Sequence, residues 1–111
     1  MMTKQEIFTK VRKHLLSQGK QAMRGSCCGY RGNDGTSCAA GCLIPDEEYH
    51  EGLEFHSVMS VHVAAVLEPI VGEANMGLVR DLQVIHDTRF SRDWAGELNT
   101  LANQYGLHTE D

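Results

Sequence analysis

Long apolar runs are missing from this chain. No segment approaches the roughly 18 consecutive apolar residues that a membrane-spanning helix needs, so we expect no membrane association. The N-terminal segment MMTKQEIFTKVRKHLL lacks both the apolar core and the small-residue cleavage site of a secretion signal. We therefore expect a cytoplasmic protein, in which the four cysteines are free thiols or metal ligands rather than disulfides.

An excess of basic residues is also missing. The chain has 15 acidic and 10 basic residues, a formal net charge of −5 at pH 7. Binding to a nucleic-acid backbone requires a basic surface, so this balance disfavours nucleic acid as a partner. Internal repeats and the G-x-x-x-x-G-K-S/T phosphate-binding loop are absent as well. With 111 residues, 41% of them hydrophobic, we expect one folded domain over residues 1–111.

The unusual residues gather in the central stretch 26–49, which holds all four cysteines. Its segment Gly32-Asn33-Asp34-Gly35 is a strong turn signal, because these residue types tolerate positive φ. The flanking segments 26–31 and 36–44 are predicted to pair as antiparallel strands of a hairpin at about 26–44. A turn centred on Asn33-Asp34 places Arg31 opposite Thr36. Whether residues 38–42 form a strand or a helical turn stays open at this point.

Helical periodicity dominates the rest of the chain. Thr3 and Glu6 fit a capping box that begins a first helix, and Gly19 fits its end. Three further helices are predicted, the first capped by Ser57 and closed by Pro69 and Gly72, the others over 73–90 and 94–105. The fold class is therefore α+β: an N-terminal helix, the hairpin, then three helices packed on one face of the hairpin.

A zinc site is one candidate for chemistry, with Cys27, Cys28, Cys38 and Cys42 as ligands and His50 or His56 nearby. The strand interpretation argues against it, because Cys38 and Cys42 would then lie about 13 Å apart. A helical turn over 38–42 would bring them together. Adjacent Cys27 and Cys28 also differ from the usual C-x-x-C pair of a zinc knuckle. Buried thiols without a cofactor are the simpler interpretation, and zinc is kept as the alternative cofactor.

A cysteine-dependent hydrolase or transferase is the second candidate. If 38–42 is helical, Cys38 lies at a helix N-terminus, where the helix dipole lowers a thiol pKa. His86 would be its base, and Asp87 or Asp81 would orient His86. Adjacent residues on one helix point about 100° apart, however, so we expect Asp87 to orient His86 poorly.

Binding to another protein is the third candidate. The predicted surface combines the hairpin with the acidic loop that follows it, and its residues are Tyr30, Arg31, Asn33, Asp34, Asp46, Glu47 and Glu48. An exposed hairpin edge would also allow self-association into a homo-oligomer.

The block C-G-Y-R-G-N-D-G-T-S-C-A-A-G-C-L-I-P-D-E-E-Y, from Cys28 to Tyr49, resembles a family of small bacteriophage and prophage proteins with a C-x-Y-R-G…C-A-x-G-x-L-I-P-D pattern. The segments L-Q-V-I-H-D (82–87) and W-A-G-E-L…Y-G-L (94–107) resemble the C-terminal half of that family. The resemblance implies expression inside a bacterial host and supplies no activity. The leading hypothesis is therefore a small intracellular protein that binds a host or phage protein and modulates a host process.

Overall fold

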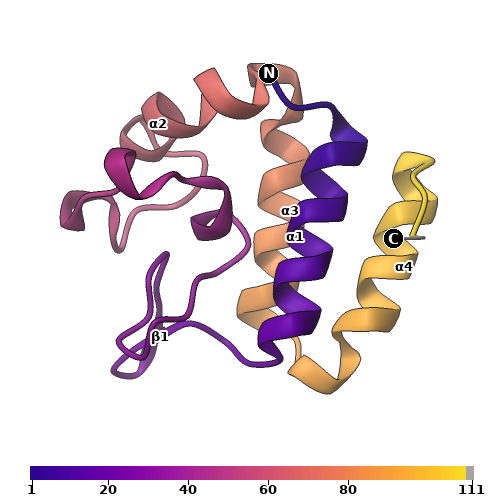
Figure 1. Cartoon of the computed structure of the whole chain (residues 1–111), viewed down its shortest axis with the longest axis horizontal. Helices are drawn as coiled ribbons and strands as arrows, with labels where there is room; N and C mark the ends of the chain where they lie inside the picture. Colours follow the sequence, from indigo (N-terminus) through magenta and orange to yellow (C-terminus); the bar gives the residue numbers. More distant parts are fainter. Residues whose placement is uncertain (110–111) are drawn as a thin grey trace.

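The computed structural model describes residues 1–109 and confirms the predicted α+β order of one helix, one antiparallel hairpin and three further helices (Figure 1). The four α-helices are α1 (Lys4–Gln18), α2 (Val61–Val71), α3 (Met76–Thr88) and α4 (Trp94–Tyr105), and the strands are β1 (Met23–Arg24) and β2 (Cys27–Cys28). Five 3-10 turns join them: η1 (Gly41–Leu43), η2 (Asp46–Glu48), η3 (Glu51–Leu53), η4 (Glu73–Asn75) and η5 (Ser91–Asp93). None of the helices in residues 1–109 is long and apolar enough to cross a membrane.

Helix α1 has the ends that the sequence predicts. The Thr3 hydroxyl accepts from Glu6 N–H at 3.1 Å, and the Glu6 carboxylate accepts from Thr3 N–H at 2.8 Å. Gly19 ends the helix in the left-handed conformation at φ +71°, which glycine adopts at little cost. The predicted capping box is confirmed.

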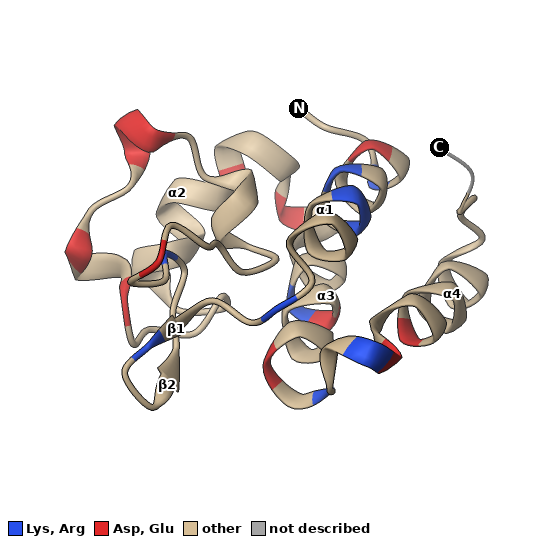
Figure 2. Cartoon of the chain, turned by 60° about the horizontal axis from the view of Figure 1, so that its bottom comes forward, with Lys and Arg blue, Asp and Glu red and all other residues tan. Residues whose placement is uncertain are grey.

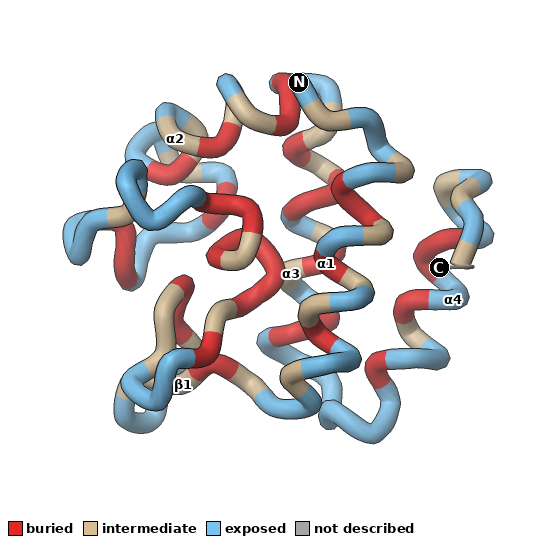
Figure 3. The backbone as a smooth tube through the Cα atoms, viewed as in Figure 1, coloured by how far each residue is buried: buried red, intermediate tan, exposed pale blue. Residues whose placement is uncertain are grey.

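The core lies between α1, α3 and α4, which pack on one another (Figure 1). The tube in Figure 3 shows buried and exposed stretches alternating along all three helices. The fully buried side chains on this side include Ile7, Phe8, Val11, Leu15, Val79, Leu82, Trp94 and Leu98. Each large one contributes about 1.5–3 kcal/mol on burial, so the packing of these helices is a large contribution to the stability of the fold.

The hairpin lies several residues earlier than predicted. Met23 pairs with Cys28 and Arg24 with Cys27 around a turn in which Gly25 has φ +66°. The predicted turn at 32–35 closes only an isolated bridge, between Arg31 and Ser37 rather than Arg31 and Thr36. Strand 26–31 cannot continue because the N–H groups of Tyr30 and Arg31 donate to the Glu54 carboxylate instead of to a neighbouring strand.

Residues 38–43 form a helical turn, so the predicted strand over 36–44 is wrong in this part. Cys42 N–H donates to Cys38 O at 3.0 Å, and Leu43 N–H donates to Ala40 O at 3.0 Å. The turn packs against α1, and Gly41 lies so close to the Tyr30 backbone that no side chain would fit there. Cys38 and Cys42 therefore lie one turn apart rather than about 13 Å apart along a strand.

Helix α2 begins later than predicted. Its cap is Ser60, whose hydroxyl accepts from Val63 N–H, whereas the Ser57 hydroxyl accepts from Met59 N–H in the preceding turn. Residues 54–59 therefore stay outside the helix and form a loop. This loop faces α3 across the groove described below.

Candidate functional site

Two hydrogen bonds hold the His86 ring, and the sequence did not predict this combination. Ala22 N–H donates to His86 Nε2 at 2.9 Å, and His86 Nδ1 lies 2.7 Å from Asp87 Oδ1. Because Nε2 accepts, the neutral ring carries its proton on Nδ1 and donates it to Asp87. The expectation that Asp87 orients its neighbour poorly is wrong: the two side chains turn toward each other in the last turn of α3, where His86 is buried and Asp87 is exposed.

This arrangement leaves His86 without a lone pair for a thiol. Both ring nitrogens are engaged, one by a backbone donor and one by a carboxylate. Cys38 is fully buried, and desolvation raises the pKa of its thiol, while Gly41 N–H donates to its sulfur at 3.2 Å. A nucleophile needs the opposite, a lowered pKa and a free base. The geometry therefore gives Cys38, His86 and Asp87 a structural role.

Gln83 extends this network to a second loop, a part that sequence reasoning missed. Its Oε1 accepts from Ala40 N–H at 2.9 Å, and its Nε2 donates to Asp87 Oδ1 at 2.8 Å. Gln83 and Asp87 lie four residues apart on one face of α3, a spacing that could have suggested the pair. The Gln83–His86–Asp87 network ties the chain at Ala22 and at Ala40 to the same helix.

Among residues 1–109, the side chains that converge as metal ligands are Cys28, His86 and Asp87, whose ligand atoms lie within 4.8 Å of one another. The predicted set of Cys27, Cys28, Cys38 and Cys42 is not brought together: Cys27 is exposed and Cys38 is buried in the core.

The converging trio fits zinc poorly. Coordination through His86 Nδ1 would move its proton to Nε2, where it would face the Ala22 N–H. Burial, followed by the neighbouring Asp87, raises the pKa of Cys28 to about 11, so its thiol stays protonated at neutral pH. Zinc binds thiolate and a free imidazole lone pair, and this site offers neither without rearrangement.

The predicted binding surface divides into buried and exposed parts. Tyr30 is buried, and its hydroxyl donates to His56 O at 2.6 Å. Arg31 donates to Asp46 at 2.7 Å and to Ile44 O at 2.7 Å, and its guanidinium lies over the Tyr49 ring. The prediction that Tyr30 is part of a binding surface is therefore wrong. The contacts of Arg31 lie largely within the protein itself, so its role is mainly structural. The remaining members are exposed: Asn33, Asp34, Asp46, Glu47 and Glu48.

Glu54 is a buried carboxylate at the start of the loop. It accepts from Tyr30 N–H at 2.9 Å, Arg31 N–H at 3.1 Å and the Tyr49 hydroxyl at 2.6 Å. Burial of such a charge is tolerated only when hydrogen bonds replace its water. The backbone donors Tyr30 and Arg31 lie more than twenty residues before Glu54 along the chain, so no local sequence pattern marks this carboxylate as buried.

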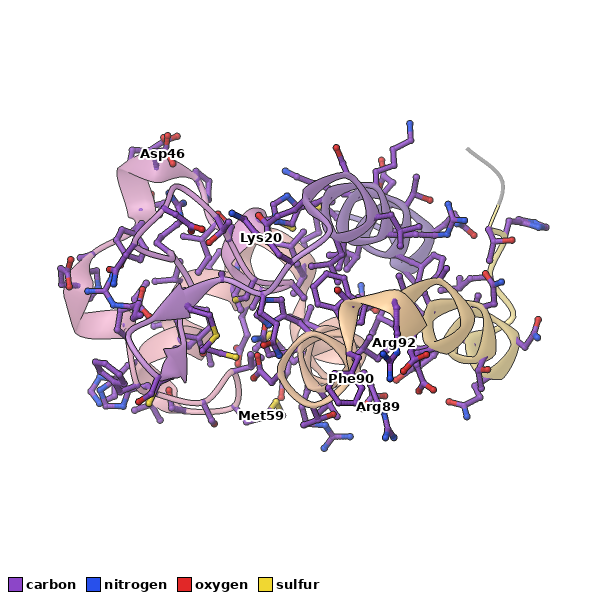
Figure 4. The ribbon with its side chains drawn as sticks, turned by 90° about the horizontal axis from the view of Figure 1, so that it is seen from below. Lys20, Asp46, Met59, Arg89, Phe90 and Arg92 are labelled. Carbon is purple, nitrogen blue, oxygen red and sulfur yellow. The ribbon has the colours of Figure 1, made fainter. Side chains whose placement is uncertain are left out.

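A groove of about 270 Å³ lies between the loop 54–59 and α3. Buried Tyr30 and Val58 line its interior, and the α3 residues that line it are Arg80, Gln83, Val84 and Asp87. Three large apolar side chains in its lining are exposed to solvent: Phe55 by 76%, Met59 by 53% and Val84 by 47%. Figure 4 shows Met59 at the edge of the molecule. The groove is an apolar depression with an apolar rim.

Phe55 combines exposure with an unfavourable backbone. Its φ is +65°, and it is the non-glycine residue of 1–109 in the left-handed region, which costs an L-residue roughly 1–2 kcal/mol. The surrounding structure enforces this conformation: Leu53 and Glu54 are buried on one side, and His56 O accepts from Tyr30 on the other.

The comparisons with protein-family models, with curated proteins and with solved structures give no match for this chain.

Proposed function

We propose that this protein acts by binding another protein, and that an apolar side chain of the partner enters the groove between the loop 54–59 and α3. The observation that carries the proposal is Phe55, an aromatic side chain that is 76% exposed on a backbone at φ +65°. Backbone strain at an over-determined surface position is typical of binding and catalytic sites. An exposed aromatic ring beside a preformed depression is typical of protein interfaces.

The groove is built for contact rather than for catalysis. The carboxylates in its lining, Glu54 and Asp87, already accept hydrogen bonds from the protein, and Cys28 holds its proton. The large apolar side chains that the groove presents to solvent are Phe55, Met59 and Val84, and they lie among the exposed polar residues His56, Ser57, Arg80 and Asp87. A partner that covers these side chains would remove apolar surface from water, and each Å² removed contributes roughly 25 cal/mol of favourable free energy.

The resemblance to phage proteins supports a host or phage protein as the partner. Such a partner would be met in the bacterial cytoplasm. Self-association through the hairpin edge receives less support, because β1 and β2 are each two residues long and offer few free backbone groups.

Site-specific photo-crosslinking in bacterial cells tests the proposal. A photoreactive phenylalanine analogue is placed at residue 55, at residue 59 and, as a control, at Leu16, which is exposed on α1 away from the groove. We expect the same covalent adduct from positions 55 and 59 and none from position 16. In purified form, the Phe55→Ala variant should no longer bind the crosslinked partner, whereas the Leu16→Ala variant should still bind it. Equal adducts at all three positions, or none at 55 and 59, would refute the proposal.

A further inference from the structure

Two histidines on the surface lie with their rings in contact. The ring centroids of His56 and His62 are 4.3 Å apart, and the ring planes are inclined by 41°. His56 belongs to the loop 54–59 and lines the groove, whereas His62 lies in the first turn of α2. Both residues are exposed. The structure therefore places two imidazoles side by side next to the groove.

The nitrogens of these two rings are free. Within residues 1–109, the rings of His56 and His62 take part in no hydrogen bond or ion pair. His86 is the opposite case, because both of its ring nitrogens are engaged. A neutral imidazole binds a metal ion through the lone pair of its unprotonated nitrogen. The criterion by which the trio at His86 fits zinc poorly therefore favours the pair of His56 and His62 as metal ligands.

Local structure fixes the backbone of both ligands before any ion arrives. The Tyr30 hydroxyl donates to His56 O at 2.6 Å, and buried Val58 anchors the segment between the two histidines. The Ser60 hydroxyl caps α2, so His62 extends from regular helix. Ligands on a fixed backbone lose little conformational freedom when an ion binds, which favours coordination.

The separation of the rings indicates which ions fit. With metal–nitrogen bonds of about 2.0–2.1 Å, two imidazoles in adjacent positions of a square-planar or octahedral ion have centroids about 4.5 Å apart, and two on a tetrahedral ion about 5 Å apart. The observed 4.3 Å is closer to the first value. Square-planar coordination by nitrogen and oxygen is typical of Cu²⁺ and Ni²⁺.

We propose that His56 and His62 together bind one Cu²⁺ or Ni²⁺ ion, with water in its remaining coordination positions. The net charge of −5 attracts a cation to the protein, and it opposes the unfavourable effect of the helix dipole at the N-terminal end of α2. This site goes beyond the proposed function and does not depend on it.

Isothermal titration calorimetry with NiCl₂ tests the site. We expect one Ni²⁺ per chain, and binding of Zn²⁺ that is at least about tenfold weaker, because the pair supplies two ligands at a separation that suits a tetrahedral ion poorly. Cu²⁺ is titrated into the Cys27→Ser variant, so that the exposed thiol cannot reduce the ion, and should bind more tightly than Ni²⁺.

Matched variants assign the ligands. His56→Gln and His62→Gln should each weaken Ni²⁺ binding at least about tenfold, because the remaining imidazole loses a second ligand held at high effective concentration. The control His50→Gln removes an exposed histidine before η3 and should leave the affinity unchanged, as should Cys27→Ser. Both ligand side chains are exposed, so the urea midpoints of the metal-free variants should match that of the unsubstituted protein.

Three outcomes would overturn the proposal. The first is the absence of one-to-one Ni²⁺ binding, and the second is binding that survives either His56→Gln or His62→Gln. The third is an equal loss of affinity on His50→Gln, which would indicate unspecific binding by surface histidines. Zn²⁺ binding as tight as that of Ni²⁺ would overturn the assignment of the ion. The photo-crosslinking result at residues 55 and 59 is independent of each of these outcomes.

Discussion

Comparing two substitutions of Phe55 tests whether the loop stores backbone strain. Phe55→Ala and Phe55→Gly both remove the ring, but only alanine keeps the Cβ that disfavours φ +65°. The left-handed conformation costs an L-residue about 1–2 kcal/mol. Glycine lowers the free energy of unfolding by about 0.4–1 kcal/mol, because it has greater conformational freedom in the unfolded chain. The Phe55→Gly variant should therefore be more stable than Phe55→Ala by about 0.5–1 kcal/mol, because the strain relief exceeds the entropy loss.

Urea unfolding followed by fluorescence of the single tryptophan, Trp94, measures this difference, since Trp94 is fully buried. In thermal unfolding it corresponds to a rise of roughly 2–8 °C in melting temperature for a domain of this size. Lys13 is exposed within α1, whose Lys and Arg residues are blue in Figure 2, and it is the matched control site. There the order must reverse, with Lys13→Gly about 1 kcal/mol less stable than Lys13→Ala. The strain argument would be refuted if glycine were also the less stable choice at position 55.

Three further outcomes follow from buried polar groups. Glu54→Gln should lower the free energy of unfolding by about 2–3 kcal/mol, because the side-chain amide places an N–H donor toward the backbone N–H groups from which the carboxylate accepts. In the same urea assay, the exposed control Glu51→Gln should lower it by under about 1 kcal/mol. Burial raises the pKa of Cys28 to about 11 and of Cys42 to about 12, from an ordinary value near 9. The protonated thiols therefore contribute fully to the free energy of unfolding below pH 9, and this contribution is lost as the pH rises toward 11–12. Fast alkylation of either thiol at pH 7 would contradict the raised pKa values. His86→Ala should lower the free energy of unfolding by about 2–4 kcal/mol, because it leaves a cavity and removes the acceptor of the Ala22 N–H. Added zinc should not change the melting temperature of the unsubstituted protein.

Local signals predicted the helices well because their causes lie within a few residues. The capping box of Thr3 and Glu6, the left-handed Gly19 and the apolar faces of α1 and α4 all depend on neighbours three or four positions apart. The β-hairpin was misplaced because two candidate turns compete in one stretch. The segment 32–35 has more turn-forming residues, but the turn at Gly25 forms the ladder, since Glu54 takes the backbone donors that a longer strand would have used.

The candidate site depends on contacts that no local pattern marks. Glu54 lies within an acidic run, and two of the three donors that make it a buried acceptor, the N–H groups of Tyr30 and Arg31, lie more than twenty positions earlier. Phe55 has an ordinary sequence context, and its positive φ follows from the fixed positions of its neighbours. His86 and Asp87 were predicted to matter, but their role depends on Ala22 N–H, which the sequence could not place.

The packing of α1 against α4 has a consequence for biosynthesis. Helix α1 buries Ile7, Phe8 and Leu15, and part of the surface that covers it belongs to α4 (Trp94–Tyr105), which is synthesised about 75 residues later. A nascent chain that still lacks α4 therefore cannot close this core, and the apolar side chains of α1 stay accessible until residues 94–105 have been made. Folding of this core then depends on contacts that are distant in sequence and form late.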